Sequence, residues 1–277
     1  MKRILALILS LILCLSVMAV LASCDEEAPH EHAAAAEWSK DGNSHWHACT
    51  GCDEKLDKAD HTFGTATKVK NGVYNYTCTV CGEIKTETME TTITAEQFTN
   101  MTLGENYIVS VYAVHETQGT YSFVAMRDGN KWSNDEKMEV TGYSGRDYYF
   151  IEIDGEDVYV YETELDDDGN IVTCTKEKRD EMTPAQMIES NEQECLPDSF
   201  RDLSLFTYDE QTNTYVAASI VKDSYSLTNV KIAFENGKIV AMSYTETFEG
   251  NGSATYEYTF VYGTASVTIP EVTPPAA

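Results

Sequence analysis

Four cysteines in the first third of the chain stand in two CxxC pairs. Cys49 and Cys52 form the first pair, and Cys78 and Cys81 form the second. Each pair follows an aromatic or histidine-rich run and precedes an acidic residue, so one short unit is used twice. Two such knuckles offer four thiolates, which can hold one tetrahedral zinc ion. Because four protein ligands leave no position for water, the pattern predicts a structural zinc ribbon.

Histidines near the first pair leave the ligand set open. His45, His47 and His61 flank Cys49 and Cys52. On a strand, His45, His47 and Cys49 would point to the same side. A mixed cysteine and histidine site is therefore an alternative to four cysteines. Two disulfides are a second alternative outside the cytoplasm. A redox CxxC is a third, although no βαβ pattern surrounds either pair.

The amino terminus predicts the location of the protein. Two basic residues precede an apolar run from Ile4 to Leu21, which is typical of a secretory signal. The sequence Leu21-Ala22-Ser23-Cys24 resembles the lipobox of bacterial lipoproteins. The resemblance implies cleavage after residue 23, acylation of Cys24 and attachment to the extracytoplasmic face of the cell membrane. An ordinary cleaved signal, or an uncleaved membrane helix, is the alternative interpretation.

The charge of the chain limits its partners. Asp and Glu number 46 against 19 Lys and Arg, for a net charge of −27. So acidic a surface argues against nucleic acid and against a domain lying flat on anionic lipid. The charge fits a soluble body held at the bilayer only by its anchor.

Two further cysteines, Cys174 and Cys195, lie outside the signal, the lipobox and the two CxxC pairs. They either form a disulfide or are buried as small apolar groups.

The cysteine segment resembles a known type of repeat. Its matching residues are His45, Trp46, His47, Cys49, Cys52, His61, Thr62, Phe63, Cys78, Cys81 and Gly82. They follow the pattern HWHxCxxC…HTF…CxxCG of small cysteine/histidine repeats in surface proteins of Gram-positive anaerobes. The segment departs from that pattern at Asp53, where the family usually has glycine. The resemblance implies zinc binding and no agreed activity.

We expect five parts along the chain. Residues 1–23 are a signal peptide, residues 24–38 a tether and residues 39–90 the zinc-ribbon-like module. Residues 91–271 form a curved β domain, and residues 272–277 a tail. Within the tether, His30 and His32 are interpreted as tail residues that would at most hold a metal loosely. The polar, threonine-rich run before Ile93 marks the boundary between the two folded parts.

The second folded part reads as α+β and mostly antiparallel β. Alternating apolar residues predict about ten strands, and pairs such as Asp128-Gly129 and Asn236-Gly237 predict the turns between them. Only two short helices are expected. Thr94 with Gln97, and Thr183 with Gln186, have the spacing of a capping box at a helix start.

Several of these strands are apolar on both faces. Tyr149, Ile151 and Ile153 alternate with Tyr148 and Phe150. A sheet that is apolar on both faces must be covered on both faces, and two short helices cannot cover ten strands. Either the sheet closes on itself, or one concave face stays open for an apolar ligand.

The order of turns and strand ends over residues 93–270 is similar to the lipoprotein-carrier superfamily of bacterial envelopes. The residues that carry this resemblance are Asn106–Val111, Met126–Trp132, Tyr148–Phe150, Phe200–Asp202, Asn236–Ile239 and Tyr262–Pro270. The resemblance implies a half-barrel sheet closed by helices over an apolar cavity. It fixes no ligand-binding residue.

No constellation for catalysis is recognisable in the sequence. Hydrolase, metalloprotease and phosphate-loop motifs are absent, and His115 is the only histidine after Phe63. We therefore expect a non-enzymatic, membrane-anchored lipoprotein with a structural zinc module and a β domain that binds an apolar ligand or lipid. Two alternatives stay open: a surface lipoprotein that contacts envelope proteins without a small ligand, and a zinc-handling lipoprotein.

Overall fold

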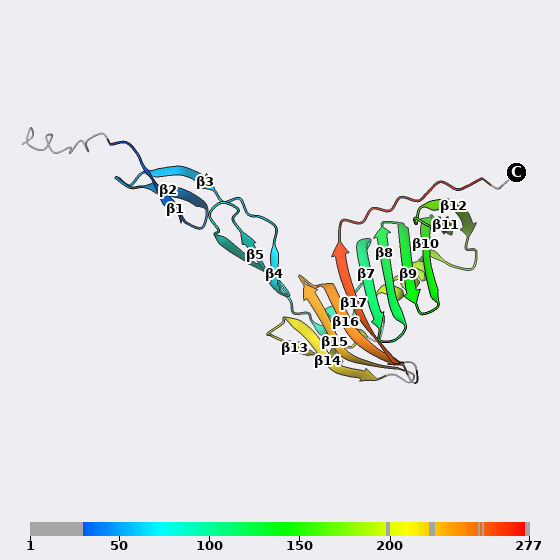
Figure 1. The fold of residues 1–277 in the computed structure, drawn as a ribbon. Coiled ribbons are helices and arrows are strands. Elements are labelled where there is room, and N and C mark those ends of the chain that lie inside the picture. Colours follow the sequence, from blue (N-terminus) through cyan, green and yellow to red (C-terminus); the bar gives the residue numbers. More distant parts are fainter. Residues whose placement is uncertain (1–29, 198–199, 222–224, 249, 251, 275–277) are drawn as a thin grey trace, which may run out of the picture. The chain divides into compact units, whose positions relative to one another are not determined.

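The structure is a computed structural model that describes residues 30–197, 200–221, 225–248, 250 and 252–274 (Figure 1). The expected signal peptide and Cys24 lie outside these residues. Within the described part of the chain, no helix has the length and apolar character needed to span a membrane.

The chain divides into two compact units. The described part of the first unit comprises residues 30–65 and 76–85, and the second unit comprises residues 66–75 and those from 86 onward. The expected boundary near residue 90 therefore differs from the observed division. The reason is that residues 66–75 form a hairpin that bonds to the β domain. The side-chain amide of Asn71 in this hairpin donates to the Phe234 carbonyl at 3.0 Å and to the Asn213 carbonyl at 2.9 Å.

A three-stranded antiparallel sheet begins the first unit. It consists of β1 (Ala34–Lys40), β2 (Ser44–Cys49) and β3 (Lys55–Asp60). The expected tether over residues 24–38 is wrong in its described part, because β1 pairs along β2. Trp38 lies opposite His47, and its ring packs edge-on against His45 at a centroid distance of 4.6 Å. A second small sheet follows, with β4 (Thr67–Lys70), β5 (Val73–Thr77) and β6 (Ile84–Thr88).

One open, curved sheet of eleven antiparallel strands forms the second unit (Figure 1). Its strand order is β12-β11-β10-β9-β8-β7-β17-β16-β15-β14-β13, so two meanders join where β17 pairs with β7. The strands are β7 (Asn106–His115), β8 (Gly119–Asp128), β9 (Lys131–Val140), β10 (Tyr143–Asp154), β11 (Asp157–Leu165), β12 (Ile171–Lys178), β13 (Thr207–Asp209), β14 (Thr214–Val221), β15 (Tyr225–Glu235), β16 (Lys238–Phe248) and β17 (Gly252–Tyr262). The predicted α+β class with a half-barrel-like antiparallel sheet is confirmed.

The two predicted helix starts are also confirmed. Helix α2 (Ala95–Thr99) and helix α3 (Pro184–Cys195) each begin with a capping box. Thr94 accepts the backbone N–H of Gln97, and Thr183 accepts that of Gln186. A 3-10 turn, η2 (Leu203–Leu205), precedes β13. These caps satisfy N–H groups that the first helical turn leaves without partners.

The larger core lies on what we call the inner face of the sheet, the face that carries Trp132, Ile151 and Tyr258. Residues paired directly across neighbouring strands share a face, which places Phe123, Glu136 and Asp147 there as well. Fully buried side chains from α2, the segment after α3 and the sheet fill the part of this face around β15 and β16. Examples are Phe98, Leu196, Phe200, Phe234 and Val230.

Two different segments cover the two faces of the doubly apolar strands. On the inner face, Met187 of α3 packs with Trp132, Ile151, Val158 and Val160. On the outer face, Val267 packs with Phe150, Tyr161 and Cys174. Val267 belongs to residues 263–274, which we call the C-terminal strap. The strap crosses to the edge strand β12, where Thr273 and Cys174 exchange hydrogen bonds of 2.8 and 2.9 Å.

The remaining cysteines are buried free thiols. Cys174 lies in the cluster under the strap, and Cys195 lies in the large inner core. The pair is therefore not bridged, and burial raises the pKa of both thiols. The interpretation of small buried apolar groups accounts for them.

Candidate metal centres

The structure divides the four paired cysteines between two separate groups of potential metal ligands. Centre A consists of His30, His32, Cys49 and Cys52; centre B consists of His45, His61, Cys78 and Cys81. In each group, the four ligand atoms lie within 4.8 Å of one another. The expected single site of four cysteines is therefore not formed. The mixed cysteine and histidine alternative describes both groups, with one CxxC knuckle and two histidines in each.

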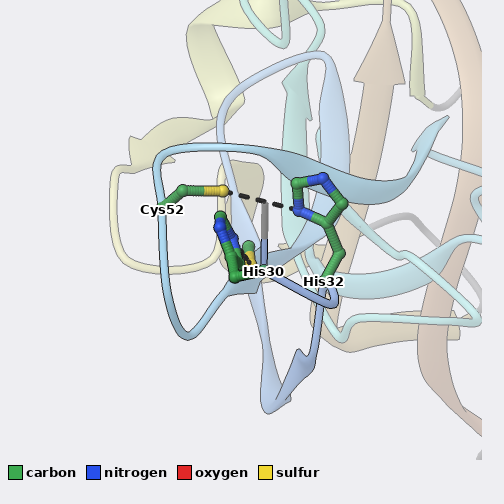
Figure 2. A group of neighbouring side chains, drawn as sticks. His30, His32 and Cys52 are labelled. Atoms are coloured by element: carbon green, nitrogen blue, oxygen red, sulfur yellow. Dashed lines mark hydrogen bonds between the residues drawn. The ribbon is translucent and has the colours of Figure 1, made fainter. Parts of the chain in front are cut away.

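Centre A joins the start of the described chain to the first knuckle. Cys49 Sγ lies 3.6 Å from His30 Nε2, and Cys52 Sγ lies 3.5 Å from His32 Nδ1. Figure 2 shows Cys52 and His32 pointing toward each other, with the ring of His30 beside them. Gly51 makes this approach feasible, because a Cβ at that position would lie 3.0 Å from the His30 ring.

Centre B is assembled from β2, the chain after β3 and the second knuckle. His45 Nδ1 lies 3.4 Å from His61 Nδ1, and Cys81 Sγ lies 3.4 Å from the same His61 atom. Cys78 Sγ lies 4.0 Å from His45 Nδ1. The other nitrogen of His61, Nε2, donates to the Asp41 carbonyl at 2.7 Å. This bond leaves Nδ1 as the ligand atom, the usual outer-shell arrangement for a metal-bound histidine.

These separations match those of a tetrahedral zinc site. Zn–S bonds of about 2.3 Å and Zn–N bonds of about 2.05 Å place sulfur and nitrogen about 3.5 Å apart across a tetrahedron. The closest sulfur–nitrogen separations are 3.6 and 3.5 Å in centre A and 3.4 Å in centre B. Both groups can therefore close around an ion without moving the backbone far. The donor set of two thiolates and two imidazoles suits zinc among the common divalent ions.

Hydrogen bonds around the first cysteines of the two knuckles prepare thiolates for metal binding. Backbone donation from Gly51, followed by the His32 side chain, lowers the pKa of Cys49 to about 5. Backbone donation from Cys81 lowers the pKa of Cys78 to about 6. A metal ligand must be the thiolate, so these N–H groups favour the protonation state that binds.

The two knuckles are successive copies of one unit. Cys49 N–H donates to the Glu54 carbonyl, and Cys78 N–H donates to the Glu83 carbonyl. The following residue of each knuckle donates its N–H to the carbonyl of the residue just after His32 or His61: Thr50 donates to Ala33, and Thr79 donates to Thr62. His32 precedes Cys52 by 20 residues, and His61 precedes Cys81 by the same 20.

That equal spacing is the signal by which His32 could have been identified from the sequence. The cysteine pairs alone do not reveal it, and the neighbouring alanines suggested a tail. His30 lies two residues before His32, so in an extended chain the two side chains point to the same side. Once His32 is identified as a potential ligand, His30 is therefore identified as well. Both histidines, interpreted as tail residues, instead contribute half of centre A.

His47, proposed as an alternative ligand, belongs to neither group. Its ring packs on Trp38 at a centroid distance of 3.8 Å. A register shift in the β2–β3 pairing between His45 and His47 separates the environments of these two residues. The other two alternative ligands, His45 and His61, are both part of centre B.

The two centres differ in exposure. In centre B, His45 is 3% exposed and Cys78 is 2% exposed. In centre A, Cys49 is buried but His30 and His32 are exposed to solvent. Solvent and chelators therefore have more direct access to centre A.

Comparison with known proteins adds no relative. No protein-family model matches the chain, and no curated protein is significantly similar to it.

Proposed function

We propose that this chain is a non-enzymatic lipoprotein of the cell envelope, anchored through acylated Cys24 on the extracytoplasmic face of the membrane. The support is the sequence Leu21-Ala22-Ser23-Cys24 after an apolar signal. Two acyl chains on one residue anchor a protein stably, whereas one chain does so only marginally. Mass spectrometry of the amino-terminal peptide tests this proposal. A diacylglyceryl group on Cys24 is expected, and loss of membrane association in Cys24→Ala.

The metal in both centres is zinc, and its role is structural. The observation that carries this proposal is the closure of each centre by four protein ligands, two sulfurs and two nitrogens. A closed tetrahedral site leaves no coordination position for a substrate. The first unit is small, and a structural zinc ion contributes folding free energy that a core of this size does not supply.

Zinc stoichiometry tests the arrangement directly. Native mass spectrometry of the mature chain carrying Cys24→Ser is expected to find two zinc ions. Replacing Cys49 and Cys52 by Ser should remove one ion, and replacing Cys78 and Cys81 should remove the other. A single four-cysteine site predicts a different result, in which one ion is bound and either double replacement removes it.

The β domain binds an apolar ligand on its inner face. Although much of that face is filled, a hollow of about 480 Å³ remains at the end near β8, β9 and β17. Its walls include Tyr121, Met138, Val140, Tyr256 and Tyr258. Aromatic walls around a hollow of this size are typical of small-molecule sites. Co-purification of an apolar molecule with the folded protein, detected in organic extracts, tests this proposal.

Zinc handling is a second candidate, and the exposure of His30 and His32 is the observation that favours it. A centre that delivers zinc must exchange it, so exposed ligands suit that role better than buried ones. Under this candidate, centre A would exchange its ion with a chelator while the protein remains folded. Retention of both ions until unfolding would exclude this role.

A further inference from the structure

A groove of about 530 Å³ lies between helix α3 and strands β9, β10 and β11 on the inner face. The side chains of Met187, Ser190, Asn191 and Glu194 line it from α3. Their spacing places them on one side of the helix. Apolar residues from the strands and from the chain before α3 form much of the opposite wall. These residues are Tyr149, Ile151, Val160 and Met182.

Three carboxylates face this groove without a basic partner. Glu136 lies directly opposite Asp147 on the neighbouring strand, and Glu194 approaches from α3. Like charges directly opposite in a sheet destabilise it. None of the three carboxylates forms an ion pair within the described part of the chain; the groove's arginine, Arg179, is paired with glutamates instead.

The pKa values of two of these carboxyl groups are raised, by burial and by repulsion between the like charges. Burial, followed by repulsion from Asp147, raises the pKa of the Glu136 carboxyl. Burial, followed by repulsion from Glu136, raises the pKa of the Glu194 carboxyl. A cation between Glu136 and Glu194 would relieve both effects, because it offsets the repulsion and the loss of water.

A buried hydrogen-bond acceptor next to the groove also has no partner. Asn134 is completely buried, and its Oδ1 accepts no hydrogen bond. It lies on the inner face, two residues before Glu136 and directly opposite Tyr149. Its amide nitrogen donates to Asn191 Oδ1 at 3.2 Å. Glu136, Tyr149 and Asn191 all line the groove. A buried polar atom without a partner costs free energy. Asn134 does not itself line the groove, so an N–H donor there would satisfy this atom once the side chains that cover it move.

We propose that the groove under α3 binds an organic cation with N–H donors on an apolar body, such as an alkylammonium ion. The apolar walls receive the body, and Glu136, Asp147 and Glu194 receive the ammonium group. This inference rests on the proposed apolar-ligand function of the β domain, extends it from the hollow near β17 to the groove under α3, and adds the charge of the ligand. A neutral ligand would remove water from the carboxylates without compensation, and an anion would be repelled.

Three probes with the same eight-carbon chain test the proposal. Octylamine, octanol and octanoate are titrated calorimetrically at neutral pH into the zinc-loaded mature chain carrying Cys24→Ser. We expect octylamine to bind about tenfold or more tightly than octanol, because charge-assisted hydrogen bonds are stronger than neutral ones. Octanoate should bind least.

Two variants connect the effect to the groove. Glu136→Gln with Glu194→Gln should reduce octylamine affinity to within about twofold of octanol affinity. If the double variant does not fold, Glu136→Gln alone should reduce the difference between octylamine and octanol affinities. The matched control is Glu189→Gln, on the exposed side of α3 and outside the groove. It should leave the preference unchanged.

The remaining outcomes separate the two proposals. Equal binding of octylamine and octanol would overturn the cation inference and leave the apolar-ligand function standing. Binding of none of the three would overturn the cation inference and count against the apolar-ligand function. A preference for octylamine that survives in the glutamine variants would show that the cation binds elsewhere, which also overturns the inference.

Discussion

His45 lies directly opposite Ala59 in the β2–β3 pair. In the copied unit, Cys78 follows Cys49 by 29 positions, and the same offset carries His30 to Ala59. The second copy therefore lacks one of its own histidines, and His45 of the first copy takes that place among the potential ligands of centre B, from across the strand pair. Strand β2 thus contributes His45 to centre B and Cys49 to centre A.

The position of His45 in centre B predicts that its replacement removes one zinc ion and that a histidine at position 59 restores this ion. His45→Ala should reduce the zinc content from two ions to one, because centre B retains only three ligands. Adding Ala59→His to that variant should restore the second ion, since residue 59 occupies the position that His30 has in the first copy. Native mass spectrometry measures both results.

A control for this pair is His47→Ala. His47 lies on the same strand as His45 but contacts Trp38 and belongs to neither centre. The His47→Ala variant should bind two zinc ions, with at most a modest loss of folding stability from the lost packing of the His47 ring on Trp38. Loss of an ion in His47→Ala would contradict the assignment of His45 as the ligand.

Unequal exposure predicts unequal release of the two ions. With excess chelator, the ion of centre A should leave about ten times faster than the ion of centre B, because opening of a solvent-exposed segment requires less free energy than opening of a buried one. A colorimetric zinc indicator should record two kinetic phases. The fast phase should be absent from the variant with Ser at positions 49 and 52. One phase in the wild-type chain, or disappearance of the slow phase in that variant, would contradict this order.

Local patterns predicted local structure well. Thr94 with Gln97 identified a helix start because the capping box is complete within four residues. The turn at Asn236-Gly237 was predictable for the same reason, and both residues have positive φ. The doubly apolar strands correctly indicated a sheet covered on both faces. None of these required knowledge of which strands are neighbours.

The metal centres and the strap depend on distant contacts, which a pattern of residue types does not reveal. The division of the four cysteines follows from strand pairing that brings histidines to each knuckle, not from the CxxC spacing. Val267 covers the outer face because the chain crosses that face after β17. Ala265, Val267 and Ile269 alternate with polar residues, which indicates a buried side of the strap but not which strands it covers. Helix α3 and the strap therefore cover the doubly apolar strands on their two faces while the eleven-stranded sheet stays open.

The carboxylate of Glu235 predicts a pH-dependent attachment of the hairpin at residues 66–75. It accepts hydrogen bonds from Tyr74 Oη at 2.7 Å and from Gly72 N–H at 3.0 Å, and it pairs with Lys68 at 3.2 Å. Burial alone would raise the pKa of Glu235, but these three partners hold it below the ordinary value of 4.5.

A depressed carboxyl pKa stabilises the folded state at pH values above the unfolded pKa, and this contribution is lost as pH falls through the folded pKa. Glu235→Gln should therefore lower the free energy of unfolding by about 1–2 kcal/mol at pH 7. The difference from wild type should shrink toward pH 3. Urea unfolding at several pH values measures it, with exposed Glu257→Gln as the control. A difference that is constant with pH would contradict the role of the charge.

The C-terminal strap predicts a stability difference between two valines of the same segment. Val267 is 6% exposed and packs on Phe150 and Tyr161, whereas Val272 is 46% exposed. Val267→Ala removes two buried methyl groups and should lower the free energy of unfolding by about 1–2 kcal/mol. Val272→Ala should change it by less than about 0.5 kcal/mol. Urea midpoints of the two variants provide the comparison. Equal, small effects would mean that the strap does not cover the outer face, and that Phe150 and Tyr161 are protected in another way.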